Sequence, residues 1–373
     1  MRDLPLAAAL SLLCACHTVE VEPFRDGSDV GKRVEDETLL WDQSDEFDDT
    51  VASAGLLYED EELRTYVQGV LERLFPEFEG VLHVRVLTSP VVNAFTLPSG
   101  SIYVHAGLLA ILDSEAQLAS VLAHEGSHFT HRHGMRTRAQ SSNAGTLATV
   151  LSCAGLGLFA GPLAASSISG YSRDLEREAD QLGFARTVAA GYEPGQAVEA
   201  FRRLLARCRA EEEESSLFFA SHPALEERIA SYEALSAASP GGGDAGVELY
   251  EKRTAAITRS ALESELELRD FAAVLTMLEL QGGRLSPGHA SYYRGEALRQ
   301  RGGDGDPAAA RAAFEEALRE SPDLVPAHRS LGRLCLRLGD RESARVHLAR
   351  YLELAPDAPD RAYVENELGG IPR

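Results

Sequence analysis

This sequence has few cysteines, an excess of negative over positive charge, and only a short apolar run at its N-terminus. Five cysteines among 373 residues do not make a disulfide framework, and a chain of this length needs none to stabilise its core. The 36 Lys and Arg residues are outnumbered by 58 Asp and Glu, which leaves a net charge of −22. This balance argues against nucleic acid and anionic lipid surfaces as partners.

The short apolar run belongs to an export signal. Leu4–Leu13 follows Arg2 and is ten residues long, which is too short to span a bilayer. It ends in Leu13-Cys14-Ala15-Cys16, which resembles a bacterial lipobox, so we expect residues 1–15 to be a lipoprotein signal peptide and Cys16 to carry the lipid. A plain secretory signal cut nearby is the alternative. His17, in place of Asp, permits transfer to the outer membrane by resemblance to bacterial sorting rules.

Residues 124–128 read His-Glu-Gly-Ser-His. Each helical residue advances about 100°, so His124, His128 and Glu125 share one sector of a helix. Two imidazoles in one sector can bind one metal ion while the carboxylate stands beside the ion without binding it. Ser114 and Gln117 form a capping box, and an apolar stripe completes the predicted helix: Leu118, Val121, Leu122 and Phe129. The alternative is a solvated helix with two surface histidines, but Glu125 lies at the edge of the stripe, where an ionised carboxylate needs a partner or a function.

A second motif supplies the third protein ligand that catalytic zinc usually takes. Residues 176–180 read Glu-Arg-Glu-Ala-Asp, within a helix predicted over residues 172–190. Glu176 and Asp180 are about one turn apart and share a face. We expect Glu176 to be the third ligand and Asp180 to accept a hydrogen bond that fixes the tautomer of a ligating histidine. Glu178 points away, and we expect it to form a solvated ion pair with an arginine.

Together these motifs resemble the gluzincin peptidases that include HtpX, the CAAX prenyl proteases, the mitochondrial Oma-type proteases and periplasmic BepA. Residues 93–104 resemble the edge hairpin along that family's substrate cleft, and Ser221-His222-Pro223 with Arg228-Ile229-Ala230 resembles its short His-Pro segment. The four motifs occur in the family's order and cover residues 60–235. Gly126 departs from the pattern, because a larger apolar residue is usual there, and Gly costs a helix interior about 1 kcal/mol relative to Ala.

The resemblance implies further roles near the metal. His222 can occupy the open zinc position and hold the enzyme latent; the alternative is that it donates a hydrogen bond to the transition state, and Arg173 is a second candidate donor.

We expect strands at 93–97 and 101–105 whose exposed edge holds an extended peptide, with Asn93 binding the substrate backbone or, alternatively, serving only the turn. His131 and His133 lie further round the helix, and we expect both to be solvated.

Charge and composition divide the rest of the N-terminal part. Residues 20–62 hold 16 acidic and 3 basic side chains, so we expect residues 16–50 to be an acidic flexible tether, with an inhibitory strap over the zinc cleft as the alternative. Ala144–Gly170 carries no charge and is rich in Gly, Ala and Ser. We expect it to be a helical hairpin or mobile cover near the site, with a membrane span as the alternative. The peptidase domain is expected over residues 51–236, followed by a flexible linker over residues 237–247.

Residues 248–373 contain a repeat. Three pairs of residues are 34 apart: Pro322 and Pro356, Ala310 and Ala344, and Phe314 and Leu348. This period resembles tetratricopeptide repeats, and a degenerate unit is expected around Phe271–Leu280. Such helix pairs need neighbours to bury their apolar faces, so we expect one stacked solenoid whose concave side binds a protein partner. The alternative is that the repeats only pack on the peptidase domain.

The sequence therefore predicts a mainly α (α+β) fold, with a helical zinc-peptidase domain, a small antiparallel β-sheet and a C-terminal tetratricopeptide α-solenoid. The predicted function is a zinc-dependent endopeptidase of the bacterial periplasm, lipid-anchored at the outer membrane, with one Zn²⁺ per chain. Its expected substrates are misfolded or stalled envelope proteins, and its expected partner is envelope assembly machinery. Glu125 is the predicted base, which takes a proton from water and returns it to the leaving amine. The alternative is a lipoprotein assembly factor that acts mainly by repeat-mediated binding, with a latent peptidase site.

Overall fold

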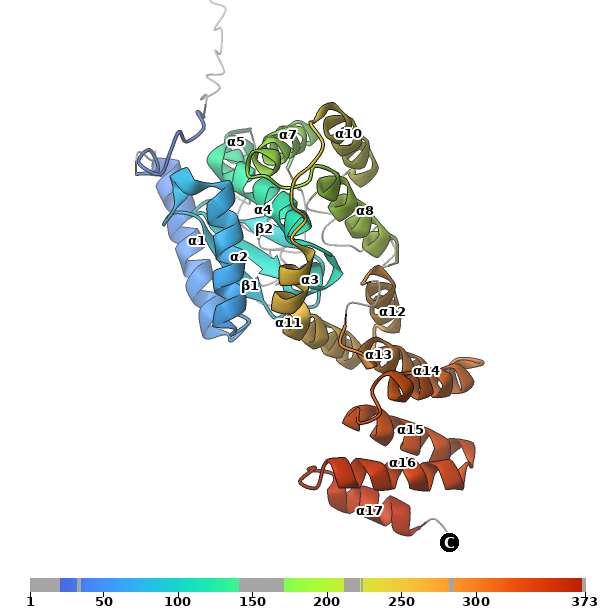
Figure 1. The fold of residues 1–373 in the computed structure, drawn as a ribbon. Coiled ribbons are helices and arrows are strands. Elements are labelled where there is room, and N and C mark those ends of the chain that lie inside the picture. The colour runs from blue at the N-terminus through green and yellow to red at the C-terminus, as the bar shows by residue number, and fades with distance from the viewer. Residues whose placement is uncertain are drawn as a thin grey trace, which may run out of the picture.

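The computed structural model describes residues 21–31, 35–140, 171–210, 222, 224–281 and 285–370. Helices surround a small sheet in the N-terminal part, and the C-terminal helices extend from it as a row of stacked pairs (Figure 1). The predicted signal peptide, Cys16, Cys153 and the uncharged segment 144–170 lie outside the described residues. Within the described residues, no helix is both long and apolar enough to cross a bilayer.

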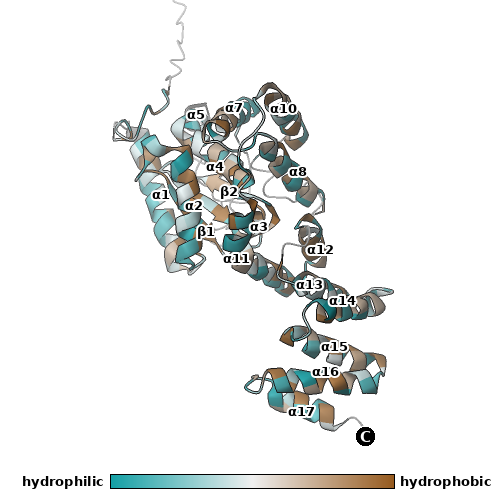
Figure 2. Ribbon diagram, viewed as in Figure 1, coloured by the Kyte–Doolittle hydropathy of each residue, from teal (hydrophilic) through white to brown (hydrophobic). Residues whose placement is uncertain are grey.

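Helix α1 (Glu35–Ser53) replaces much of the predicted tether. Its buried residues are spaced three or four apart and form one face: Glu37, Leu40, Ser44, Asp48 and Val51. The two acids on this face are paired, Glu37 with Arg132 at 2.5 Å and Asp48 with the hydroxyl groups of Ser101 at 2.6 Å and Tyr103 at 2.5 Å. The prediction of a flexible tether over 16–50 is wrong from Glu35 onward. Figure 2 colours α1 mainly hydrophilic, and composition alone would place its acidic side chains in solvent. Glu37 and Asp48 are buried because their partners lie far away in the sequence.

The next elements are α2 (Glu61–Leu74), the short 3-10 helix η1 (Pro76–Phe78) and the strands β1 (His83–Leu87), β2 (Ala94–Thr96) and β3 (Ser101–His105). The predicted hairpin is confirmed, since β2 and β3 pair antiparallel and Gly100 N donates to Leu97 O at 3.0 Å across the turn. However, β1 pairs with β3 in parallel, and the strand order is β1-β3-β2. The sheet is therefore mixed, and the prediction of an antiparallel sheet is wrong for β1. The chain reaches β2 first and returns through β3 into the central position, which gives β3 the direction of β1.

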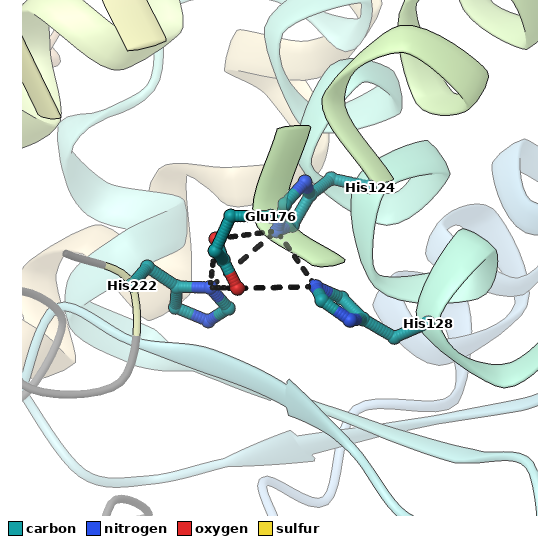
Figure 3. A group of neighbouring side chains, drawn as sticks. All are labelled: His124, His128, Glu176 and His222. Carbon is teal, nitrogen blue, oxygen red and sulfur yellow. Dashed lines mark hydrogen bonds and ion pairs between the residues drawn. The ribbon is translucent and has the colours of Figure 1, made fainter. Parts of the chain in front are cut away.

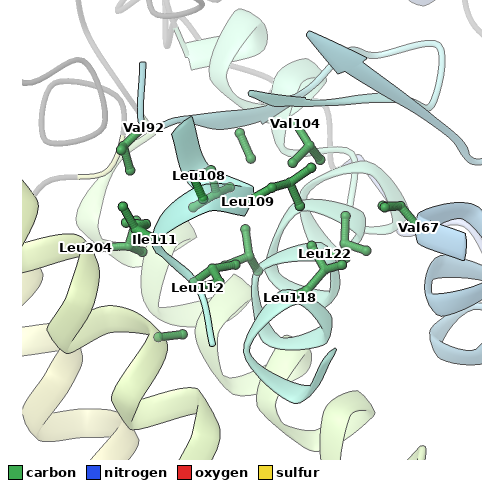
Figure 4. Close-up of a cluster of buried hydrophobic side chains, with 14 of the residues drawn as sticks. Val67, Val92, Val104, Leu108, Leu109, Ile111, Leu112, Leu118, Leu122 and Leu204 are labelled. Atoms are coloured by element: carbon green, nitrogen blue, oxygen red, sulfur yellow. The ribbon is translucent and has the colours of Figure 1, made fainter. Parts of the chain in front are cut away.

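The short α3 (Ala106–Ile111) leads into α4 (Glu115–Thr130), every residue of which is buried. The cap predicted at Ser114 is confirmed, because Ser114 Oγ accepts from Gln117 N at 3.2 Å. The return bond of the capping box is shifted by one residue, since Gln117 Oε1 accepts from Asp113 N at 2.8 Å. The apolar residues of α4 meet side chains from α2, α3 and the sheet in one core (Figure 4): Val67, Val104, Leu108, Leu109, Leu118 and Leu122. The first sequence motif is therefore anchored in the centre of the domain.

Four more helices complete this part: α5 (His133–Gln140), α7 (Arg173–Ala189), α8 (Gly195–Ala210) and α10 (Leu225–Ala238). Helix α7 packs along α4, and α10 packs on α7 and α8. The close crossing of α7 and α4 depends on Gly183, because a Cβ there would lie 2.8 Å from His124 N. This crossing determines where the second motif meets the first.

The end of the predicted linker is held in place by the peptidase part of the fold. Ala245 O accepts from Ala116 N at 3.0 Å, and Asp244 O accepts from Glu193 N at 3.2 Å. A Cβ on Gly246 would lie 2.7 Å from Glu115 Cβ. The end of the predicted linker, residues 244–246, is therefore in contact with the peptidase part, whereas Gly241 and Gly242 meet nothing within 4 Å.

The repeat region consists of α11 (Val247–Leu268), α12 (Phe271–Leu280), α13 (His289–Arg301), α14 (Asp306–Glu320), α15 (Val325–Leu338), α16 (Arg341–Leu354) and α17 (Arg361–Gly369). The predicted 34-residue period is confirmed by two equivalent pairs, α13 with α14 and α15 with α16. Gly295 faces Phe314 in the first pair and Gly332 faces Leu348 in the second, each too closely for a Cβ. Helices α11 and α12 pack on α3 and α8, so the solenoid continues directly from the N-terminal part.

Candidate metal centre

Helix α4 supplies two imidazoles and a carboxylate to one buried site. His124, Glu125 and His128 are each at most 2% exposed. On another side of the helix, a Cβ on Gly126 would come within 2.4 Å of the Phe75 ring. Phe75 thus fills the space of the larger apolar residue that the resemblance leads one to expect, which explains the departure at Gly126.

Helix α7 brings the second motif against the first. Glu176 and Asp180 lie about two turns and one turn before Gly183, on the face that packs against α4, and both are buried. Glu178 forms the predicted ion pair, with Arg136 Nη1 2.8 Å from Glu178 Oε2. The spacing in the sequence predicts that Glu176 and Asp180 share a face, and the glycine contact decides how near that face comes to the histidines.

Four side chains converge on one point: His124, His128, Glu176 and His222 (Figure 3). Their ligand atoms all lie within 4.8 Å of one another. His124 Nε2 and His128 Nε2 are 3.0 Å apart, and each lies 3.5 Å from a Glu176 carboxylate oxygen. Donors on a tetrahedral zinc ion with bonds of about 2.05 Å lie about 3.3 Å apart. The donor types and their spacing therefore fit an ion of this size.

The contact between Asp180 and His124 indicates which nitrogen of His124 faces the cluster. Asp180 Oδ1 lies 3.0 Å from His124 Nδ1. Burial would raise the pKa of Asp180, but Arg228 and His124 outweigh it and hold the pKa well below its usual value, so Asp180 is an ionised acceptor. His124 then carries its proton on Nδ1 and directs the lone pair of Nε2 into the cluster. A lone pair that faces other donor atoms is stabilised by a cation.

Glu125 stands beside the four donors. Its Oε2 accepts from Thr96 Oγ1 at 3.0 Å, and its Oε1 lies 3.4 Å from His222 Nε2. Burial raises the pKa of Glu125 in spite of the opposing effect of His222 and His124. A carboxylate with a raised pKa next to a metal can take up and return a proton near neutral pH.

His222 lies between the ligands and Glu125. Its Nδ1 is 3.1 Å from Glu176 Oε2 and 3.4 Å from His124 Nε2, and the residue is 2% exposed. Burial would lower the pKa of His222, but Glu176 and Glu125 outweigh it and raise the pKa. The side chain is thus placed as a fourth donor, the position that the resemblance leads one to expect.

Arg228 on α10 is a buried cation, and its position in the segment that resembles the family's His-Pro motif did not predict its role. Its Nη1 lies 2.9 Å from Glu176 Oε2, and Nε and Nη2 donate to the two Asp180 oxygens at 2.9 and 2.7 Å. A signal was present, because Arg228 shares a face with Leu225 and Tyr232, and an arginine on an apolar face needs a carboxylate partner. Arg173 is not brought to the cluster: its side chain is 64% exposed and pairs with Glu227 at 3.2 Å.

His133 is buried, so the expectation that it is solvated is wrong. Its Nδ1 lies 2.9 Å from His128 Nδ1. Helix α4 ends at Thr130 and Arg132 has a φ of 51°, so helical angles extrapolated past Thr130 no longer apply. Burial lowers the pKa of His133 to about 3, which keeps the ring neutral. His131 is partly exposed.

Asn93 lies immediately before β2 and is completely buried. Its side chain is therefore not accessible to a substrate in this conformation. The buried position of Asn93 does not support the expected contact with a substrate backbone. β2 lies at one edge of the sheet, and within the described residues no strand pairs with its outer side. Thr96 connects this edge to Glu125.

Comparison with known proteins agrees with this geometry. Residues 58–236 match the model of Peptidase family M48, and residues 303–366 match a tetratricopeptide repeat model. A beta-barrel assembly-enhancing protease of Yersinia pestis is 32% identical over 171 residues, 42% of this chain and 35% of that protein. A protein of the same name from Escherichia coli O157:H7 is 31% identical over 191 residues, 47% of this chain and 39% of that protein.

The mitochondrial metalloendopeptidase OMA1 of Schizosaccharomyces pombe is 32% identical over 174 residues, 44% of this chain and 50% of that protein. The chain thus spans between a third and a half of the length of these relatives. The resemblance that the four motifs indicate is confirmed, as is that of the repeats.

Proposed function

We propose that this chain, whose residues 58–236 are a Peptidase family M48 domain, is a zinc-dependent endopeptidase that binds one Zn²⁺. His124, His128 and Glu176 would hold the ion. The main support for this proposal is that the ligand atoms of these three residues and of His222 all lie within 4.8 Å of one another in a buried site. Relatives named as proteases and metalloendopeptidases support the same function.

Bound zinc would lower the pKa of a water molecule and polarise the scissile carbonyl group. Glu125 would take the proton from this water and return it to the leaving nitrogen. Thr96 holds Oε2 in place, and Oε1, which lies 3.4 Å from His222 Nε2 in this conformation, would accept the proton once His222 withdraws. Asp180 fixes the tautomer of His124, and Arg228 holds Asp180 and Glu176. The outer edge of β2, whose three residues are buried in this conformation, would have to become accessible before it could bind an extended peptide through main-chain hydrogen bonds, which confer affinity with little sequence preference.

His222 makes this conformation a latent one in our proposal. A catalytic zinc site usually combines three protein ligands with one open position, whereas four protein donors close the coordination shell. Here His222 supplies the fourth donor and approaches the base as well. Its withdrawal would open the metal to water and substrate.

The cellular role follows from the sequence and from the relatives. We propose that Cys16 carries a lipid anchor and that the protein acts in the bacterial periplasm at the outer membrane. Misfolded or stalled envelope proteins would be its substrates, and its tetratricopeptide repeats would bind envelope assembly machinery. The name of the beta-barrel assembly-enhancing proteases supports this role.

The decisive variant is Glu125→Gln. It should keep zinc, measured by elemental analysis of the purified full chain, while cleavage of envelope proteins is lost. Comparative proteomics of envelope fractions from wild-type and variant cells would then show substrates accumulating only in the variant. Cleavage at the parent rate would refute the assigned base, and a wild-type chain without bound metal would refute the zinc site. A Glu125→Gln strain that rescues every phenotype would favour the repeat-mediated assembly role instead.

A further inference from the structure

We propose that His133 is a positioning residue, which orients the zinc ligand His128 through a hydrogen bond between their Nδ1 atoms. This inference rests on the proposed zinc site. The two nitrogens are 2.9 Å apart, both residues are at most 1% exposed, and the ring planes meet at 79°. Tyr171 stacks on the ring of His128, with the two ring centroids 4.0 Å apart. His128 is therefore constrained both in the plane of its ring and across its face.

The direction of this hydrogen bond follows from the proposed zinc site. A zinc ion on His128 Nε2 would leave the N–H of that ring on Nδ1, 2.9 Å from His133 Nδ1, whereas the nearby Glu178 Oε2 is already paired with Arg136 at 2.8 Å. A neutral imidazole has one N–H and one lone pair, so the lone pair of His133 then lies on Nδ1. His128 Nδ1 must donate to it. His128 Nε2 is left with the lone pair that points to the other donors.

The two ligating histidines thus have different supports. His124 donates to a carboxylate, Asp180, whereas His128 donates to a neutral imidazole. Both contacts fix the same tautomer, with Nε2 toward the metal, and partners of this kind typically affect metal affinity by about 10- to 100-fold. His133 would therefore contribute orientation without adding a second negative charge to the site.

The N-terminal helix takes part in placing His133. Arg132 adopts a left-handed conformation with φ 51° between α4 and α5, and His133, the first residue of α5, reaches His128. The Arg132 side chain is held by Glu37 of α1, with Nε 2.9 Å from Oε1, and by the carbonyl oxygen of Glu22 at 3.0 Å. These partners precede the segment that matches the peptidase family model.

The test compares two side chains of similar size at position 133. Asn can accept a hydrogen bond near the position of the imidazole Nδ1, whereas Leu cannot. The zinc dissociation constant of the full chain would be measured by competition with a chromophoric chelator. We expect His133→Leu to weaken zinc binding about 10- to 100-fold and His133→Asn to stay within a few-fold of the parent. His131→Leu, which removes a partly exposed imidazole from the same turn, should leave the affinity unchanged.

Visible absorption of the Co²⁺-substituted proteins gives a second measurement. The spectrum should change in His133→Leu and stay close to the parent spectrum in His133→Asn, because only the Leu variant frees the ring of His128 to rotate. Equal zinc affinity in the two variants would overturn the role of His133, even if both bind less tightly than the parent. A parent chain that binds no zinc would instead overturn the proposed zinc site itself.

Discussion

Replacing Gly183 by Ala tests whether the crossing of α4 and α7 builds the metal site. An added Cβ would lie 2.8 Å from His124 N and 3.0 Å from both Ala123 C and His124 Cα, all of which are backbone atoms. These atoms cannot rotate away, so the two helices must separate. Glu176 and Asp180 are carried by the helix that moves.

The size of the effect can be worked from these distances. The shortest contact must lengthen from 2.8 Å to about 3.4 Å before it is ordinary, and overpacking of this kind costs about 1–3 kcal/mol. Ala is also the better helix former by about 1 kcal/mol, which partly offsets the cost. Metal–ligand distances in a well-formed site lie within about 0.2 Å of their usual values. Moving Glu176 and Asp180 away from the histidines should therefore lower zinc affinity by about 10-fold or more.

Gly69→Ala is the matched control, because Gly69 is also inside a helix but a Cβ there meets nothing within 4 Å. The helix-propensity and unfolded-state effects are the same in both variants and cancel in the comparison. Gly69→Ala should stabilise the metal-free chain in urea unfolding, and Gly183→Ala should be less stable than this control by about 1–3 kcal/mol. Equal stability and equal zinc affinity in the two variants would refute the reasoning.

Two further predictions concern buried histidines. His222→Ala should raise the rate of peptide cleavage, because it removes the fourth donor and opens the metal to water; lower cleavage at unchanged metal content would contradict latency and favour a transition-state donor. His105 is fully buried, and neither ring nitrogen has a hydrogen-bond partner within the described part of the chain. Burial lowers the pKa of His105 from 6.5 to about 3, so its contribution to stability is complete above pH 6.5 and is lost as the pH falls toward 3. His105→Leu should therefore lose less stability than the parent over this pH range in urea unfolding, and identical pH dependence would contradict the argument.

Short sequence patterns predicted the structural features that depend on residues close together in the chain. The helix cap at Ser114, the apolar stripe of α4 and the 34-residue repeat were all recognisable, since helical periodicity and capping act over a few residues. Composition was a poor guide to α1 and to the contacts of residues 244–246. The acids of α1 are buried against Arg132, Ser101 and Tyr103, and none of these partners can be identified from the composition of the segment itself.

The sequence by itself determined which side chains could bind a metal, because the spacing of His124 and His128, and of Glu176 and Asp180, places each pair on one face of its helix. Only the tertiary structure decided how the two faces meet, because this depends on a backbone contact at Gly183 between segments distant in sequence. It also decided which outer residues support the site. Arg228 and His133 reach the ligands through a helix crossing and a left-handed turn, and neither arrangement follows from helical periodicity.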